Sequence, residues 1–150
     1  MTDQQQETIK QILQDILSHM GITAEITTET GEPVVFNLKT EDSGMLIGSH
    51  GQSLSALQYI ARLLAYKKLN ESSSFIVDVE GYKKTREEFL RELARQAADR
   101  VRDTKESLLL KPMAAYERRV VHSEISNFPD IATESVGEEP ERRILIKPKA

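Results

Sequence analysis

The chain has 150 residues and a net charge of −4; 39% of its residues are apolar and none is cysteine. This composition excludes disulfide bonds and thiolate metal sites, and no apolar run of about eighteen residues is present that could span a membrane. The charge is uneven, because residues 1–74 hold five basic and nine acidic side chains whereas residues 75–150 hold fifteen of each, so a phosphate ligand would need a local basic face.

The first half is predicted to hold a helix, a hairpin, two further helices and a third strand. Residues 1–8 are polar and lack Lys and Arg, so they do not form a signal peptide, and a bacterial cytoplasm is the expected location. Apolar residues then recur with helical spacing up to Gly21, and afterwards they alternate with polar ones as in strands. The expected elements are a helix at 7–20, strands at 22–27 and 34–38, a helical turn ending near Gly48, a helix at 51–68 and a strand at 75–80.

The second half is predicted to hold two helices followed by two short strands. Pro112 is expected at the start of the second helix, because the first turn of a helix tolerates proline. The expected elements are helices at 82–110 and 112–126 and strands at 131–136 and 142–147. This order indicates an α+β protein of two small domains, residues 1–74 and 75–150.

The helix at 51–68 is expected to bury one stripe of apolar side chains. The members of this stripe are Leu54, Leu57, Ile60, Ala61 and Leu64. The tyrosines of the chain are expected to be partly buried, so base stacking would contribute little. They are Tyr59, Tyr66, Tyr82 and Tyr116.

Two glycines, Gly48 and Gly51, frame a four-residue corner between two predicted helices. Glycine lacks a Cβ atom, so a sugar-phosphate backbone can approach closely, and the free amides at the start of the next helix attract phosphate. By itself Gly-x-x-Gly also describes a plain helix–helix corner, which is the more frequent case. Its position after an apolar turn and between strands is the pattern with which KH domains clamp about four nucleotides.

The stretch from Gly44 to Tyr59 resembles the KH domain of bacterial Jag proteins, also called SpoIIIJ-associated proteins. The helix-then-hairpin entry is similar to the type II KH order, a three-stranded sheet with helices on one face. The resemblance implies that the corner, Gly48, Ser49, His50 and Gly51, contacts RNA. The two middle residues commonly include Lys or Arg in that family, so a neutral Ser49–His50 pair implies a weaker or pH-sensitive contact. His50 is equally compatible with an ordinary exposed histidine.

A second set of polar residues lies on the helix predicted at 112–126. Arg118 and His122 are four residues apart and share one helix face, where a guanidinium can fork around a phosphate beside an imidazole. Alone, the pair is also compatible with a histidine packed at the domain edge in a local hydrogen bond, which is the more frequent case. Three segments give the pair a richer context: Lys111–Met113, Thr133–Glu138 and Arg142–Pro148.

These segments resemble the R-three-H domain, in the form that follows the KH domain of Jag proteins. The resemblance implies helices packed on a small sheet and binding of single-stranded nucleic acid by Arg118 and His122. It also implies further phosphate contacts, each of which is equally compatible with a solvated charge: Arg119, Arg142, Arg143 and Lys147. The resemblance covers about residues 22–148, with residues 78–82 fitting at the junction, and the chain is expected to open with a helix in place of the family's additional N-terminal domain.

The leading interpretation is a Jag-type protein that binds single-stranded RNA, or single-stranded DNA, and is not an enzyme. The family implies post-transcriptional regulation linked to cell elongation and division, and pairing with a small partner KH protein or with a second copy. The alternative is a protein-interaction adaptor in which RNA binding is secondary, which the acidic first half favours. The sequence shows no phosphate-binding loop, nucleophile elbow or metal-ligand spacing of histidines, so neither a metal nor a cofactor is expected.

Overall fold

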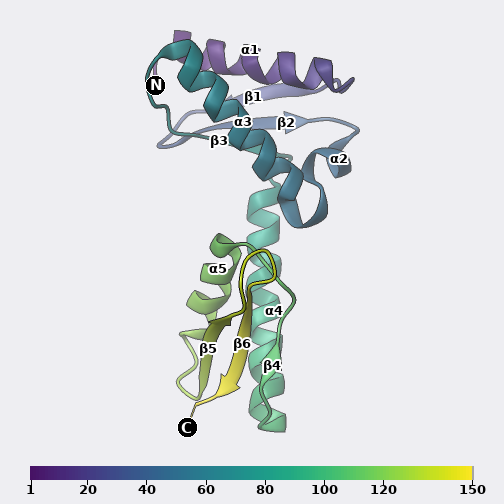
Figure 1. Cartoon of the computed structure of the whole chain (residues 1–150), viewed down its shortest axis with the longest axis vertical. Coiled ribbons are helices and arrows are strands. Elements are labelled where there is room, and N and C mark those ends of the chain that lie inside the picture. The colour runs from purple at the N-terminus through teal and green to yellow at the C-terminus, as the bar shows by residue number, and fades with distance from the viewer. Residues whose placement is uncertain (150) are drawn as a thin grey trace. The chain divides into compact units, whose positions relative to one another are not determined.

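The structure is a computed structural model that describes residues 1–149. The chain divides into two units, unit 1 (Met1–Lys83) and unit 2 (Lys84–Ala150), shown in Figure 1. Each unit has its own sheet and its own cluster of buried apolar side chains. The α+β class predicted from the sequence is therefore confirmed.

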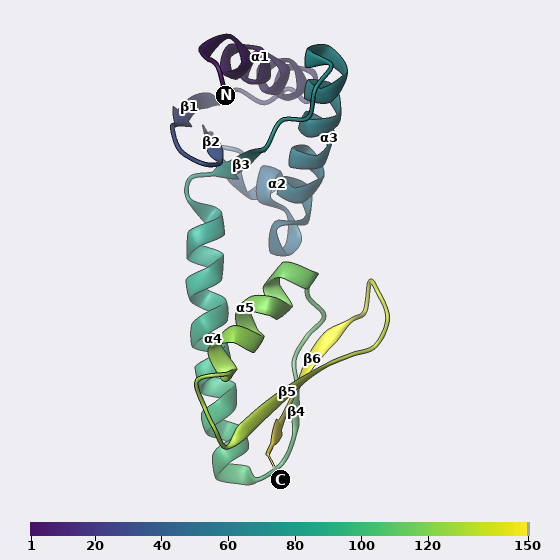
Figure 2. The ribbon, with the colours of Figure 1, turned by 90° about the vertical axis from the view of Figure 1, so that its left-hand side faces the viewer.

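Unit 1 is a three-stranded sheet covered on one face by helices (Figures 1 and 2). Its strands lie in the order β1-β2-β3, with β1 antiparallel to β2 and β2 parallel to β3. The core lies between this sheet and the helices, and the rings of Phe36 and Phe75 meet edge to face with their centroids 5.6 Å apart. The elements are α1 (Asp3–His19), β1 (Glu25–Glu29), β2 (Val34–Lys39), α2 (Ser43–Ile47), the 3₁₀ turn η1 (Ser49–Gly51), α3 (Gln52–Leu69) and β3 (Phe75–Val79).

Local signals explain where the first helix begins and ends. Thr2 and Gln5 form a capping box, in which each side chain accepts a hydrogen bond from the other residue's backbone amide. At the other end, Gly21 has a φ of +72°, a value that favours glycine, directly after the last helical turn. The helix is therefore longer at its N-terminus than its apolar spacing alone predicts.

Unit 2 is an antiparallel three-stranded sheet with two helices on one side (Figure 2). Its strands lie in the order β4-β6-β5. Buried side chains of α4, Leu90 and Val101 among them, pack with Val121 of α5 and Ile144 of β6. The elements are α4 (Tyr82–Thr104), β4 (Leu108–Leu109), α5 (Ala115–Ile125), β5 (Ile131–Val136) and β6 (Arg143–Pro148).

The helices of unit 2 are shorter than the sequence predicts. The first ends at Thr104 instead of about residue 110, because Lys105 turns the chain with a φ of +61° and Leu108–Leu109 pairs with β6. The second begins at Ala115, so the prediction of Pro112 as its first residue is wrong. In both places a sheet partner distant in sequence overrides local helix preference.

The third strand, β3, pairs with β2 and so lies in the sheet of unit 1. The sequence predicts a division between residues 74 and 75, whereas the chain divides between Lys83 and Lys84, in the first turn of α4. The polar loop at 70–74 is an evident break in composition, but it lies inside unit 1. A parallel strand needs a long crossover, and α3 supplies it here.

No helix within residues 1–149 has both the length and the apolar character that crossing a membrane requires.

Candidate nucleic-acid interface

The glycine-framed corner of unit 1 has a backbone that few residues other than glycine adopt. Gly48 has φ +70° and ψ −168°, and Gly51 has φ +80°. His50 lies between them in the left-handed region with φ +52°. Ser49 and His50 are exposed, whereas Gly51 is buried. The corner therefore presents mainly its two middle residues to a ligand.

Both glycines are also required by close packing. A Cβ atom on Gly48 would lie 2.2 Å from Oγ and 2.8 Å from Cβ of Ser53. A Cβ atom on Gly51 would lie 2.9 Å from Cε1 of Tyr82. These contacts account for the glycines without any ligand, so the evidence for binding lies in the exposure of Ser49 and His50.

The start of α3 adds a second feature to the corner. Gly51 is the N-cap residue, and no side chain accepts a hydrogen bond from the first turn. Uncapped amides at a helix N-terminus carry partial positive charge and can donate to a phosphate. The Gln52 amide already donates to the Ser49 carbonyl, so a nucleotide backbone at Ser49–His50 would meet the amides that follow it, in addition to a hydroxyl and an imidazole.

Side chains of α3 close the outer edge of β3. Gln58 Oε1 accepts a hydrogen bond from the Val77 amide at 2.9 Å, and Arg62 Nη2 donates to the Phe75 carbonyl at 2.7 Å. Lys83 Nζ also donates to Gln58 Oε1 at 2.9 Å, and burial lowers the pKa of Lys83 although the nearby Asp78 carboxylate raises it. A base could pair with this strand edge only by displacing Gln58 or Arg62.

The predicted arginine–histidine pair of unit 2 lines a pocket of about 440 Å³. Arg118, Arg119 and His122 come from α5, as their helical spacing predicts. Two hydroxyl side chains of β5, one more arginine and one alanine complete the lining, namely Thr133, Ser135, Arg142 and Ala115. Three guanidinium groups, an imidazole and two hydroxyls form a set of donors suited to phosphate oxygens.

Hydrogen bonds within unit 2 hold the pair in place. The side chain of Arg118 is only 11% exposed; its Nη1 donates to the Met113 carbonyl at 2.7 Å and forms an ion pair with Glu139 Oε1 at 3.0 Å. His122 Nδ1 is hydrogen-bonded to Thr133 Oγ1. Arg118 is thus a firmly oriented donor, and the local hydrogen bond considered for His122 is present.

Two of the predicted phosphate contacts lie on the other face of the sheet. Arg143 and Lys147 alternate along β6 with the buried Ile144 and Ile146, so they point away from the pocket. Lys147 pairs with Glu134 at 3.1 Å, and Arg143 lies 3.5 Å from a Glu141 carboxylate oxygen. The alternation of residues along a strand could have predicted this placement from the sequence, because neighbouring residues such as Arg142 and Arg143 point to opposite faces of the sheet.

A buried charge pair that the sequence did not predict joins α4 and α5. The Glu117 side chain is 1% exposed, and its carboxylate receives two hydrogen bonds from Arg86, Nη2 at 3.1 Å and Nε at 3.4 Å. The Arg86 guanidinium also lies over the ring of Phe89, 5.2 Å from its centroid. No local pattern reveals this pair, since its members are 31 residues apart.

The outward face of α3 is more apolar than the sequence predicts. Only Leu54, Leu57, Ala61 and Ala65 are buried. The prediction that Ile60 and Leu64 belong to the buried stripe is wrong, because only the small alanines face the sheet in the last two turns. The exposed side chains and their exposed fractions are Tyr59 65%, Ile60 47%, Leu63 52%, Leu64 40% and Tyr66 59%.

The four tyrosines are not all partly buried either. Tyr59, Tyr66 and Tyr116 are exposed, and only Tyr82 is of intermediate burial. The prediction is therefore wrong for three of them. Tyrosine rings on a helix surface are available for stacking or for contact with another protein.

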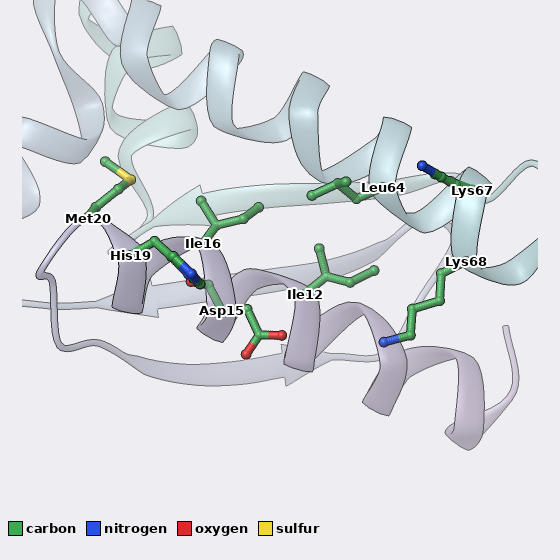
Figure 3. A pocket seen from close by; sticks show the side chains of 8 residues that line it. All are labelled: Ile12, Asp15, Ile16, His19, Met20, Leu64, Lys67 and Lys68. Carbon is green, nitrogen blue, oxygen red and sulfur yellow. The ribbon is translucent and has the colours of Figure 1, made fainter.

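An apolar groove runs between α1 and α3, beside this face (Figure 3). Ile12 and Ile16 of α1 point toward Leu64 of α3, and the volume between them is about 760 Å³. The remaining lining residues are Asp15, His19, Met20, Lys67 and Lys68. Apolar surface of this kind is typical of a protein-binding site.

Acidic and histidine side chains do not form a metal site in residues 1–149. No group of three or more such side chains lies close enough together there to hold an ion.

Comparison with protein families finds a match to each unit. The family model described as "KhpA/KhpB, KH domain" matches residues 6–79, and the model of the R-three-H domain matches residues 88–148.

Three curated relatives, each called RNA-binding protein KhpB, align with most of the chain. The protein of Clostridium symbiosum is 37% identical over 93% of this chain and 64% of its own length. That of Bacillus subtilis is 32% identical over 93% of this chain and 69% of its own length. That of Lactiplantibacillus plantarum is 30% identical over 87% of this chain and 41% of its own length. The chain thus spans less than two thirds of two of these relatives.

Proposed function

Because the chain belongs to the KhpB family, with a KhpA/KhpB-type KH domain followed by an R-three-H domain, we propose that it binds single-stranded RNA. The observation that carries this proposal is the pocket of unit 2, where Arg118, Arg119, His122 and Arg142 converge. Single-stranded DNA offers the same phosphates and is the weaker candidate.

The corner of unit 1 is the second contact in this proposal. Ser49, His50 and the amides at the start of α3 would hold a nucleotide backbone, in the manner of the KH clamp. The neutral pair contributes no fixed charge, so most of the electrostatic attraction would come from the pocket. An RNA long enough to contact both units gains affinity from the second contact without new residues.

Post-transcriptional regulation in the cytoplasm, linked to cell elongation and division, is the cellular role that we propose with this binding. It would involve no chemistry on the RNA, since the described pocket offers donors for phosphate and no paired acid and base. Arg143 and Lys147 would make no contact within the pocket, and their acidic neighbours offset much of the long-range attraction that they could add.

Replacing Arg118 by alanine should weaken binding of a single-stranded RNA about tenfold, because one charge-assisted contact is lost. The slope of log Kd against log salt should fall by about 0.7, the value for one phosphate contact on a single strand. Fluorescence anisotropy of a labelled RNA at several salt concentrations measures both quantities.

The exposed Arg119 provides the control for stability in this experiment. Arg119→Ala removes a cation from the same pocket and does not alter the contacts with Met113 or Glu139. It should lower both the RNA affinity and the salt slope, and it should leave the melting temperature unchanged. If Arg118→Ala unfolds unit 2 and Arg119→Ala leaves RNA binding intact, the pair is structural and the proposed site is wrong. Binding that does not depend on salt would favour the protein-interaction adaptor.

The exposed face of α3 supports a proposal about the protein partner. We propose that it docks another KH domain of this family, from a small partner protein or from a second copy. The face carries Tyr59, Leu63 and Tyr66, and α3 contains three cations and no acidic residue. Tyrosine and arginine are enriched at protein interfaces and lysine is depleted there, which favours the part of the face around Arg62.

Replacing Leu63 by glutamate should abolish this association, because a charge would be buried without a partner. Sedimentation velocity of the full chain, alone and with a KhpA-type KH protein, measures the species present. Gln4→Glu adds the same charge to the exposed start of α1 and should leave association unchanged. The proposal would be contradicted if the chain sediments as a monomer both alone and in the presence of the KhpA-type protein.

A further inference from the structure

The turn between β5 and β6 contacts two arginines of the pocket. Glu139 Oε1 forms an ion pair with Arg118 Nη1 at 3.0 Å, and the Gly137 carbonyl accepts a hydrogen bond from Arg142 Nη1 at 2.6 Å. Gly137 has a φ of +85°, and a Cβ atom there would lie 3.3 Å from the Glu141 carbonyl oxygen. The path of this turn therefore depends on glycine, and it delivers one acceptor to each guanidinium.

The acceptors around Arg118 select which edge of its guanidinium faces the pocket. The Met113 carbonyl accepts a hydrogen bond from Nη1, and the Glu139 carboxylate forms its ion pair with the same nitrogen. Both contacts of this side chain within residues 1–149 leave from Nη1. The Nε–Nη2 edge therefore remains for the pocket, and two parallel donors of this kind match two oxygens of a phosphate.

We propose that Glu139 is a positioning residue for RNA binding, which holds Nη1 of Arg118 so that the Nε–Nη2 edge meets a phosphate. This inference rests on the proposed function of the pocket. A carboxylate beside a phosphate site opposes the ligand by its charge, and a competing carboxylate would weaken binding. Glu139, however, shares Nη1 with Met113 instead of occupying the forked edge, which is the arrangement of a support rather than a competitor.

Substitutions of Glu139 that keep or remove an acceptor oxygen separate these two roles. In the full chain, Glu139→Ala should weaken binding of a labelled single-stranded RNA about fivefold, because the guanidinium loses the ion pair that helps to orient it. Glu139→Gln retains an acceptor for Nη1 and should bind within about twofold of the unsubstituted protein. The Glu139 side chain is 60% exposed, so neither variant should change the melting temperature.

Two controls make the result specific to Arg118. Glu138→Ala removes the same charge from the neighbouring exposed residue and should leave the affinity unchanged. In a chain that already carries Arg118→Ala, the Glu139→Ala change should have no further effect.

Tighter binding by both Glu139 variants would overturn the proposal and identify a competing carboxylate. Affinities equal to that of Glu138→Ala, or a loss that persists without Arg118, would also overturn it. If Arg118→Ala and Arg119→Ala both leave RNA binding unchanged, the proposed function of the pocket fails instead, whatever Glu139 does.

Discussion

Replacing Arg86 by alanine should lower the free energy of unfolding of unit 2 by about 3–5 kcal/mol, because the buried Glu117 carboxylate would lose its cation. The Glu117 side chain is 1% exposed and that of Arg86 is 15% exposed, so water cannot readily replace the lost partner. The Tyr116 hydroxyl, which donates to Glu117 at 3.4 Å, would remain as a weak neutral donor. Truncation of Arg86 also removes its contact with the ring of Phe89.

Hydrogen exchange measured by mass spectrometry localises this loss to residues 84–149, and urea denaturation followed by circular dichroism gives its size. A chain with two units need not unfold in one step, so the exchange data assign the transition. Arg91→Ala is the matched control, since its pair with Glu87 on the same helix is about half exposed and contributes at most about 0.5 kcal/mol.

A second variant distinguishes the lost charge partner from lost packing. Combining Arg86→Ala with Glu117→Met replaces the pair by apolar groups and should recover most of the stability, because no charge then stays buried. A double variant as unstable as Arg86→Ala alone would contradict this explanation of the pair.

Replacing Ser49 and His50 together by aspartate should weaken RNA binding at least about tenfold, because each added charge repels a nearby phosphate by about 1 kcal/mol. Both side chains are exposed, so the fold of unit 1 should not change. Anisotropy of labelled RNA gives the affinity, and the melting temperature reports on the fold.

Ser72→Asp with Ser74→Asp is the matched control for this charge change. Both serines are exposed in the loop between α3 and β3, so the pair adds the same charge to the same unit away from the corner. This control should reduce affinity only slightly, through long-range repulsion that salt screens. Equal affinities for the two double variants would show that the corner does not contact RNA.

The charge pair and the corner differ in how far the sequence could predict them. Gly48 and Gly51 are visible because only glycine adopts their backbone easily, and Arg118 and His122 are visible because helical spacing brings them to one face. Arg86 and Glu117 are both ordinary surface residues by composition, and nothing within either helix marks them as buried partners.

The error about α3 has a related cause. Apolar residues occur around most of its circumference, so spacing alone cannot tell which stripe meets the sheet. The structure shows that Ala61 and Ala65 lie against the sheet and that Ile60 and Leu64 do not. The choice depends on how closely the helix approaches the strands, which is a property of the packed unit.

By itself the sequence determined the order of helices and strands apart from the short strand β4, the α+β class, the glycine corner and the shared face of Arg118 and His122. These features depend on backbone preferences and on periods of two or 3.6 residues, which act over a few neighbours. Only the tertiary structure decided the parallel register in which β3 pairs with β2, that Glu117 pairs with Arg86, and that Glu139 pairs with Arg118. Those contacts join residues from 21 to about 40 positions apart, and burial and donor geometry select them only after the chain has folded.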